Sequence, residues 1–194
     1  MPPKPMFGRE EIIQAALQLV SERGMECLTT RGLGERLGSS ARPIFTAFKN
    51  MEELQGEVKE AAKRRFESYA AQAFDKKPLF KHVGLQMLKF AIEEPKLYQF
   101  LFMQENTGAD DFEDLFPLLG KSAEICVQSL CEEHRLDREK ARALFENVWI
   151  YTFGVGTLCA TGACHFSQEK LGEMLSAEFR GMLMLANSQM REGA

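Results

Sequence analysis

Apolar residues recur three and four positions apart along most of this chain, which is the spacing of one face of an α-helix. In the segment 9–23, for example, Ile12, Ala16, Leu19 and Val20 follow that spacing. Long strand-like alternation of apolar and polar residues is missing, and no Asn-Gly or Asp-Gly hairpin turn occurs. The sequence therefore predicts an all-α fold.

Glycines, prolines and capping residues set the expected ends of the helices. Asn50 and Asp137 are candidate N-caps, because their side chains can accept a hydrogen bond from a free backbone N–H of the first turn. Gly24 suits a helix end, and Pro95 suits a helix start. Gly38 suits the end of a short helix as well. Together these signals predict helices at about 9–23, 30–37, 40–48, 51–74, 79–93, from 95 onward, 112–134, 138–164 and 168–191, with a loop at 106–111.

Two domains are expected, residues 1–52 and residues 53–194. A chain of 194 residues can bury a core large enough to fold without disulfides or a structural metal. Its formal net charge is −4, but residues 1–50 hold seven Lys and Arg against five Asp and Glu. The rest of the chain holds seventeen against twenty-three. A surface for an anionic partner such as DNA is therefore expected in the first domain.

The cysteines indicate the redox compartment. They are odd in number and no pair has Cys-x-x-Cys spacing, which favours reduced thiols in a cytoplasmic protein. No run approaches the roughly 18 apolar residues of a membrane span, and the first six residues lack the apolar core of a secretory signal. We expect no membrane partner. The five cysteines are Cys27, Cys126, Cys131, Cys159 and Cys164.

Three short helices with a glycine turn between the second and third have the proportions of a helix-turn-helix. The turn is expected at Gly38, with Ser39 or Ser40 capping the third helix. The first turn of that helix must present small or polar side chains to the major groove of DNA, and Ser39, Ser40, Ala41 and Arg42 do so. Arg42 can contact guanine or a phosphate. The apolar residues expected to pack the second helix against the third are Leu33, Leu37, Ile44 and Phe48.

The run from Gly24 to Leu54 resembles the DNA-binding domain of the TetR family of transcriptional regulators. The family pattern has a glycine, a short spacer, a Thr-rich cap, an aliphatic-Ala pair, the run Ala-Gly-Val-Ser, and a Leu-Tyr-x-x-Phe run that leads to Lys-Glu-Glu-Leu. Its marks fall without a gap on Gly24, Thr29, Leu33, Gly38, Ser40, Ile44, Phe45, Phe48, Glu52, Glu53 and Leu54. The resemblance implies that the DNA contacts come from Thr29, Thr30, Arg31, Ser39, Ser40, Ala41, Arg42, Pro43, Phe45, Thr46, Lys49 and Asn50.

Two departures from the family pattern affect DNA binding. The family's usual tyrosine, which bonds a phosphate, is Phe45 here, and its usual lysine at the head of the fourth helix is Met51. Losing phosphate contacts weakens non-specific affinity and its salt dependence, although Lys49 can compensate in part. Pro43 also biases Arg42 away from helical geometry. An alternative function is therefore a co-regulator of the same fold that acts through protein partners.

The resemblance also implies an apolar pocket for a small hydrophobic effector in the second domain, which is rich in aromatic residues. The residues predicted to line it are Phe100, Met103, Asn147, Trp149 and Phe153. The apolar faces of 148–163 and 171–190 suggest a homodimer in which the last two helices of each subunit form a four-helix bundle. Two recognition helices would then meet half-sites about 34–36 Å apart, and an effector would release DNA by tilting the fourth helix. That mechanism makes the protein a repressor.

Other functional classes find less support in the residues. No catalytic Ser/His/Asp or Cys/His arrangement and no phosphate-binding glycine loop is evident, so we predict no enzyme and no cofactor. A helical enzyme or ligand carrier is a rival hypothesis that rests on the pocket alone. Cys159, Cys164 and His165 lack the spacing of a metal site, and we predict no metal. A thiol redox sensor stays open, and His82 and His134 are expected at the surface.

Two readings of the glycines in the expected helix 138–164 stay open. Gly154, Gly156 and Gly162 interrupt a helical pattern despite their low helix propensity. Close packing against another helix is the first explanation, and space for a ligand is the second.

Overall fold

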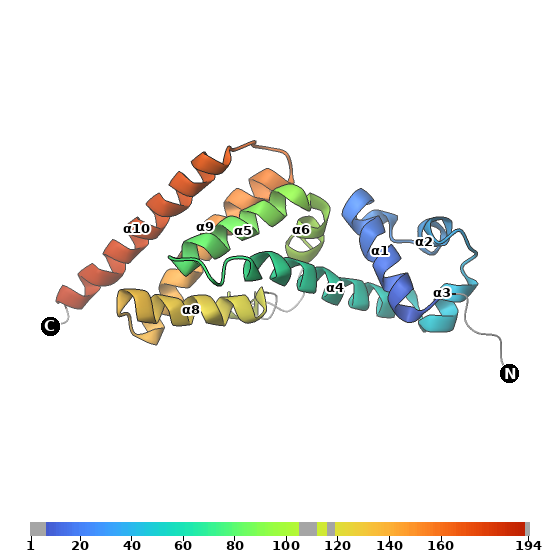
Figure 1. The fold of residues 1–194 in the computed structure, drawn as a ribbon, viewed down its shortest axis with the longest axis horizontal. Coiled ribbons are helices and arrows are strands. Elements are labelled where there is room, and N and C mark those ends of the chain that lie inside the picture. Colours follow the sequence, from blue (N-terminus) through green and yellow to red (C-terminus); the bar gives the residue numbers. More distant parts are fainter. Residues whose placement is uncertain (1–6, 105–111, 116–118, 193–194) are drawn as a thin grey trace. The chain divides into compact units, whose positions relative to one another are not determined.

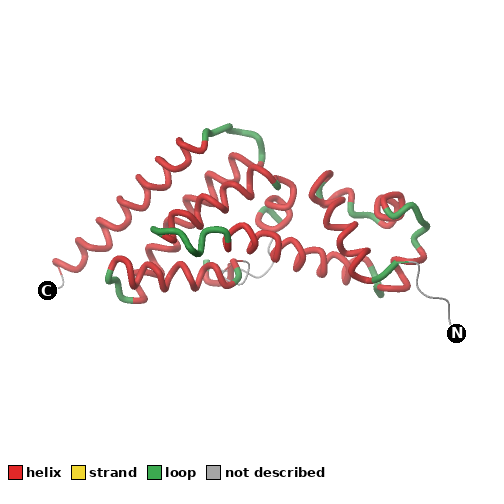
Figure 2. Tube along the Cα trace, viewed as in Figure 1, coloured by secondary structure: helices red, strands yellow, loops and turns green. Residues whose placement is uncertain are grey.

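The computed structural model describes residues 7–104, 112–115 and 119–192, and those residues form helices joined by short loops (Figures 1 and 2). The all-α prediction is confirmed. None of the helices within these residues is both long enough and apolar enough to cross a membrane. The α-helices are α1 (Arg9–Arg23), α2 (Thr30–Arg36), α3 (Arg42–Ala47), α4 (Met51–Ala71), α5 (Leu79–Glu93), α6 (Pro95–Phe102), α8 (Lys121–His134), α9 (Arg138–Ala160) and α10 (Gln168–Glu192), with 3₁₀ turns at Met25–Cys27 and Glu113–Leu115.

Several helix ends lie where the sequence predicts them. Helices α1 and α5 have the predicted bounds, and α6 begins at Pro95. The Asn50 side chain accepts a hydrogen bond of 2.8 Å from the Glu53 N–H, and Asp137 accepts one of 2.9 Å from the Lys140 N–H. Both residues therefore cap the helices that follow them.

Four predicted helix ends are wrong. The N-cap of α3 is Ala41, which has no capping side chain, in place of Ser39 or Ser40. Helix α4 ends at Ala71 and is followed by turns. Helix α8 begins at Lys121, because Gly120 has a φ of 61° that no helix continues through, and Glu113–Leu115 is a separate 3₁₀ turn. Helix α9 ends at Ala160, before Gly162 at φ 71°. The predicted loop at 106–111 lies outside the described residues.

The chain packs as two compact units. The first comprises Met1–Arg65 and Glu94–Glu105, and the second comprises Phe66–Glu93 and Asn106–Ala194. Helix α6 belongs to the first unit because it packs against α1. The predicted boundary between residues 52 and 53 therefore differs from the division by packing, which runs through α4 and returns between α5 and α6.

In the second unit, α9 packs against α5, α8 and α10. Figure 1 shows α10 running beside α9 and α5. One cluster of its core joins Leu88 of α5, Val155 of α9, and Leu171 and Leu175 of α10, all buried. These four side chains fix three helices around the region that contains the cavity described below.

The buried Glu94 carboxylate bonds to two other helices of the first unit, at the points where the chain leaves this unit and returns to it. Glu94 is buried and accepts a hydrogen bond of 2.7 Å from the Ser21 hydroxyl of α1. It also forms an ion pair with Arg65 of α4. Arg65 is the last residue of the first unit before the chain passes into the second, and Glu94 is the residue at which it returns. Both crossing points are thus bonded to each other.

Candidate functional site

The turn between α2 and α3 depends on two glycines and one threonine. The Thr29 hydroxyl caps α2 by accepting a hydrogen bond of 3.0 Å from the Gly32 N–H. Gly38 has a φ of 62°, a left-handed conformation that glycine adopts without steric cost. A Cβ at Gly34 would lie 3.0 Å from the Ser39 carbonyl oxygen, so a small residue lets the turn approach α2 closely.

Three of the four residues predicted to pack α2 and α3 are buried. Leu33 and Ile44 are 0% exposed and Phe48 is 2% exposed, whereas Leu37 is half-buried. Leu28, in the segment before α2, is buried as well. The apolar spacing therefore identifies which side chains of this region are buried.

An arginine from α1 holds the end of α3. The Arg9 guanidinium donates hydrogen bonds to the Ala47 carbonyl (2.8 Å), Glu53 (2.9 Å) and Glu57 (2.8 Å), and lies 4.2 Å from the centre of the Phe48 ring. Hydrogen bonds to Glu57 and Glu53 raise the pKa of Arg9. The Lys49 backbone N–H and the Arg9 guanidinium hold the pKa of the Glu53 carboxyl below its usual range. The end of α3 and the start of α4 are therefore fixed together.

One face of α3 and the residues after it stay open to solvent. Arg42, Phe45, Thr46 and Lys49 are exposed, and Phe45 has 50% of its surface accessible. The Thr46 hydroxyl donates to the Arg42 carbonyl at 3.0 Å. Among the described residues, nothing bonds the Arg42 guanidinium, so it is available to an external partner. Along the sequence of this face, Phe45 lies between the cations Arg42 and Lys49. Ile44 and Phe48 of the same segment are buried.

A shallow depression continues this face onto α2. On α2, Arg31 is highly exposed and pairs with Glu35 at 2.9 Å, so its charge is partly neutralised within the depression. The lining residues are mostly small or polar, as required of a surface that approaches DNA closely. They are Thr30, Arg31, Gly34, Glu35, Gly38, Ser39, Ser40 and Ala41.

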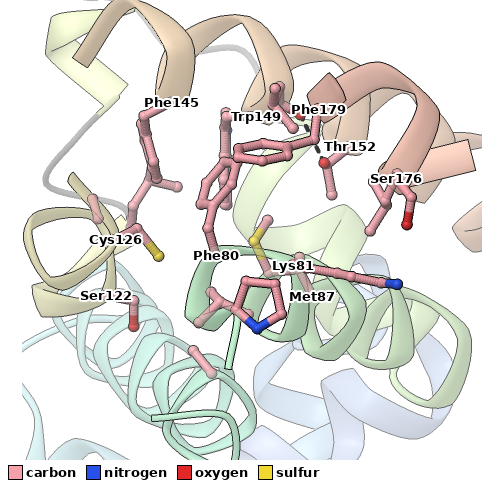
Figure 3. Close-up of a pocket in the computed structure, with 18 of the residues that line it drawn as sticks. Phe80, Lys81, Met87, Ser122, Cys126, Phe145, Trp149, Thr152, Ser176 and Phe179 are labelled. Atoms are coloured by element: carbon pink, nitrogen blue, oxygen red, sulfur yellow. Dashed lines mark hydrogen bonds between the residues drawn. The ribbon is translucent and has the colours of Figure 1, made fainter. Parts of the chain in front are cut away.

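The second unit encloses an apolar cavity of about 250 Å³. Figure 3 shows the Phe80 ring among Phe145, Trp149 and Phe179, with the Cys126 sulfur pointing toward them from α8. The cavity is built from α4, α5, α8, α9 and α10 and the residues next to them. The described lining residues are Phe66, Ala70, Pro78, Phe80, Lys81, Val83, Gly84, Met87, Leu119, Ser122, Ala123, Cys126, His134, Phe145, Val148, Trp149, Thr152, Leu175, Ser176, Phe179 and Arg180.

Residues 12–58, which include the whole turn and its flanking helices, match the model of the family described as "Bacterial regulatory proteins, tetR family". The same region is 45% identical over 53 residues to the class C tetracycline repressor protein of Escherichia coli. That match covers 27% of this chain and 24% of the repressor. The N-terminal region of the chain is therefore similar to regulators of the TetR family.

The remainder of the chain shares the fold of solved TetR-family proteins at low sequence identity. A transcriptional regulator from Aquifex aeolicus VF5 superposes with a TM-score of 0.62 at 18% identity, over 91% of this chain and 98% of that one. A substituted TetR from Acinetobacter baumannii AYE, in complex with minocycline, superposes with a TM-score of 0.55 at 22% identity, over 97% and 99%. At these identities the likeness concerns the fold, and the family whose model matches residues 12–58 is one of bacterial regulatory proteins.

The residues predicted to contact DNA lie on or beside the α2–α3 turn. Some of these residues are exposed and others are half-buried, and the two groups are interspersed along the sequence. Asn50 is occupied in part by its capping bond to Glu53, and Ser40 accepts a bond of 3.4 Å from the Arg42 N–H. Exposed are Thr29, Arg31, Ser40, Arg42, Phe45, Thr46, Lys49 and Asn50, and half-buried are Thr30, Ser39, Ala41 and Pro43.

The five residues predicted for the pocket do not gather at the cavity. Trp149 lines it. Phe100 is buried in α6 and Met103 follows α6, so both belong to the first unit. Asn147 is exposed on α9 and donates to the Ala143 carbonyl at 2.8 Å, and Phe153 lies outside the lining residues. A ligand in the cavity would therefore meet a different face of α9, that of residues 145, 148, 149 and 152.

Most of the residues that line the cavity were not predicted from the sequence. His134 is not a surface residue: its ring lies 5.2 Å from the Phe179 ring, and its Nε2 atom is buried without a partner in the described part of the chain. Phe80 and Met87 of α5, with Phe179 of α10, were part of the apolar helical pattern. That pattern could show that they are buried, but not that they face a cavity.

The Cys126 thiol, which lines the cavity, has low reactivity. Burial raises the pKa of the Cys126 thiol to about 12, so it stays protonated at neutral pH and is a poor nucleophile. Burial, with Cys164 nearby, also raises the pKa of Cys159. All five cysteines are free, and the described residues contain no group of three or more potential metal ligands. The raised pKa values do not favour Cys126 or Cys159 as the thiol of a redox sensor.

Proposed function

We propose that this protein is a repressor that binds DNA as a homodimer and is released by a small ligand in the cavity. The observation that carries the proposal is the course of α4. Its first turns contribute Leu54 and Val58 to the core of the first unit, and its last turns contribute Phe66 and Ala70 to the cavity wall. A ligand that displaces the wall can act on the same helix that follows the recognition helix α3.

The exposed face of α3 suggests how DNA is read. Arg42 can make a bidentate contact to guanine, and Phe45, three residues later on the same face, can contact the methyl group of thymine. Lys49 can contact a phosphate. We therefore expect an operator half-site that contains a guanine close to a thymine.

Capture of sheared genomic DNA by the purified protein, followed by sequencing, tests DNA binding and names the operator. On that operator, Arg42→Ala is expected to weaken binding by about 10- to 100-fold, which corresponds to one lost base contact. Lys121→Ala removes an exposed cation from α8 and serves as the matched control. Equal losses for both variants, or no enriched fragment, would contradict the proposal.

The homodimer is proposed from an exposed stripe on α9 and α10. Ile150 and Leu158 of α9 are 52% and 40% exposed, and Met184 and Leu185 of α10 are 73% and 55% exposed. Small residues between them would let two copies approach closely, which gives Gly154 a packing role. The exposed residues of the stripe are Ala143, Asn147, Ile150, Gly154, Leu158 and Thr161 on α9, and Ala177, Gly181, Met184, Leu185 and Ser188 on α10.

Sedimentation at micromolar concentration tests the dimer. The native protein is expected to sediment as a dimer and Ile150→Glu as a monomer, because the substitution buries an unpaired charge in the interface. Ile92→Glu places the same charge on a residue of α5 that is 46% exposed and lies off the stripe. A native monomer, or equal behaviour of the two variants, would refute the dimer.

The exposure of Phe45 also favours the alternative function of a protein-binding co-regulator, since half of an aromatic ring is available to a partner. Met51, at the first position of α4, supplies no phosphate contact. If this alternative holds, the native protein enriches no genomic fragment, whereas the variant with Phe45→Tyr and Met51→Lys gains affinity for DNA. Tight binding of the native protein to its own operator excludes the alternative.

A further inference from the structure

The described lysine and arginine side chains that line the cavity are positively charged, and no described carboxylate lines it. Lys81 of α5 and Arg180 of α10 line it, and no Asp or Glu is found among the described lining residues. Lys81 is half-buried and Arg180 is exposed, so the two cations lie toward the solvent-facing side of an otherwise apolar space. Figure 3 shows the Lys81 side chain extending toward the α10 side of the cavity, where Ser176 lies.

Neither cation is neutralised by the protein. Within the part of the chain that the structure describes, the Lys81 amino group and the Arg180 guanidinium have no hydrogen bond or ion pair. Other cations of the chain form ion pairs, such as Lys77 with Glu133 at 2.7 Å and Arg138 with Glu124 at 2.8 Å. Two cations without an acid next to an apolar cavity are therefore suited to an anionic group of a ligand.

The other described polar groups of the cavity include no carboxylate that would compete with an anionic ligand. The hydroxyls of Thr152 and Ser176 donate to carbonyls of their own helices, at 2.7 Å and 2.6 Å. The Cys126 thiol is protonated at neutral pH, because burial raises its pKa. The buried Nε2 atom of His134 has no partner in the described residues and can hydrogen-bond a polar atom of the ligand.

The walls indicate the body of the ligand. The Phe145 and Trp149 rings are stacked with centres 5.9 Å apart, and Phe80 lies 5.7 Å from both Phe145 and Phe179. Such a cluster favours flat, apolar groups. A volume of about 250 Å³ is slightly below the roughly 300–1,000 Å³ of pockets for drug-sized ligands, so the ligand is small.

We infer that the effector is a small amphiphile with an aromatic body held among Phe80, Phe145, Trp149 and Phe179 and an anionic group held by Lys81 and Arg180. This inference rests on the proposed function, in which the cavity is the effector site. It excludes a cationic effector, because a positive group would meet two cations and, in the described lining, no acid to balance them.

Trp149 is the single tryptophan of the sequence and lines the cavity, so its emission reports on the site directly. The full-length protein without DNA is titrated with 4-phenylbutanoate, its uncharged amide and 4-phenylbutylammonium, with excitation selective for tryptophan and with calorimetry in parallel. These probes share an aromatic body and differ in charge. The carboxylate is expected to bind about tenfold more tightly than the amide, and the ammonium most weakly.

Two variants assign the preference to the proposed residues. Lys81→Met and Arg180→Met are each expected to reduce the preference for the carboxylate over the amide, while amide affinity stays within about twofold. Lys121→Met, which removes an exposed cation that is not among the described lining residues, is expected to keep the preference. Circular dichroism and urea unfolding check that each variant is folded.

The outcomes separate this inference from the proposed function. Equal binding of carboxylate and amide, tighter binding of the ammonium, or no binding of any probe overturns the anionic effector. Carboxylate preference that survives both cavity substitutions overturns the assignment to Lys81 and Arg180. If the carboxylate binds as expected but leaves the captured operator bound, the effector class stands and the release mechanism of the proposed function fails.

Discussion

Several polar side chains of the first unit are bonded within the protein, whereas several polar groups that line the cavity of the second unit have no partner among the described residues. In the first unit, Arg9 bonds a helix-end carbonyl and two glutamates, and Arg36 bonds Glu22 and Gln18. In the cavity, Lys81 and the Nε2 atom of His134 have no partner in the described part of the chain. A surface that must keep one shape is built by completing its contacts, whereas a site that must accept a ligand leaves contacts open.

The largest expected effect concerns packing. Leu33→Ala in the first unit is expected to lower the free energy of unfolding by about 2–5 kcal/mol, because Leu33 is 0% exposed and its removal creates a cavity. Leu175→Ala on the cavity wall is expected to cost about half as much, since the wall already lacks partner atoms on one side. Urea unfolding measures both. Equal losses would show that the wall is packed as tightly as the core of the first unit.

The opposite change sharpens the same comparison. Val58→Leu adds a methylene to a fully buried position of α4 in the first unit and is expected to cost about 1–3 kcal/mol through overpacking. Val148→Leu adds the same group beside the cavity and is expected to change stability by less than about 0.5 kcal/mol, while weakening binding of 4-phenylbutanoate. A large destabilisation by Val148→Leu would mean that the cavity cannot accept added atoms.

Single hydrogen bonds should show a smaller contrast. Asn50→Ala is expected to cost about 1 kcal/mol, because it removes the capping bond to the Glu53 N–H. Ser122→Ala removes a hydroxyl that lines the cavity and that has no protein partner within the described residues. It is expected to leave stability unchanged. Thermal unfolding of the two variants side by side checks the difference, and a loss at Ser122 would reveal a bond to the protein.

The smallest expected effect is on pH dependence. The folded-state pKa of Glu53 is lowered by the Lys49 N–H and Arg9, so its stabilising contribution is present above the unfolded pKa of about 4.3. That contribution is lost as the pH falls through the lower folded value. Glu53→Gln should therefore flatten the fall of the urea midpoint between pH 5 and pH 3 relative to the native protein. Identical slopes would show that Glu53 is not coupled to folding.

The sequence predicts most of the helical framework because helix ends depend on local signals. Asn50 and Asp137 cap their helices by bonds within three residues, and Pro95 begins α6. The predicted start of α8 was wrong because the pattern of apolar residues continues through Gly120, whereas the positive φ of Gly120 stops the helix from extending through it. The turn between α2 and α3 is also local, so its glycine and its apolar residues could be predicted from spacing, whereas the DNA-contacting residues were implied by the resemblance to the TetR family.

The cavity could not be predicted in the same way because it depends on which face of each helix points inward. Helix α9 is apolar on most sides after Val148, so its periodicity does not separate the cavity face from the exposed stripe. Asn147 and Trp149 were therefore predicted together, although they lie on different faces. The packing of Phe100 with the first unit depends on the contact of α6 with α1, which no local pattern contains.

The Arg65–Glu94 pair has a consequence for how the molecule opens. Because the pair joins the residues that bound the segment 66–93, neither α4 at Arg65 nor the start of α6 can unwind without breaking the pair. Opening at the two crossings is then one cooperative event. Amide hydrogens near residues 65 and 94 should exchange at matching rates, although 29 positions separate them along the chain.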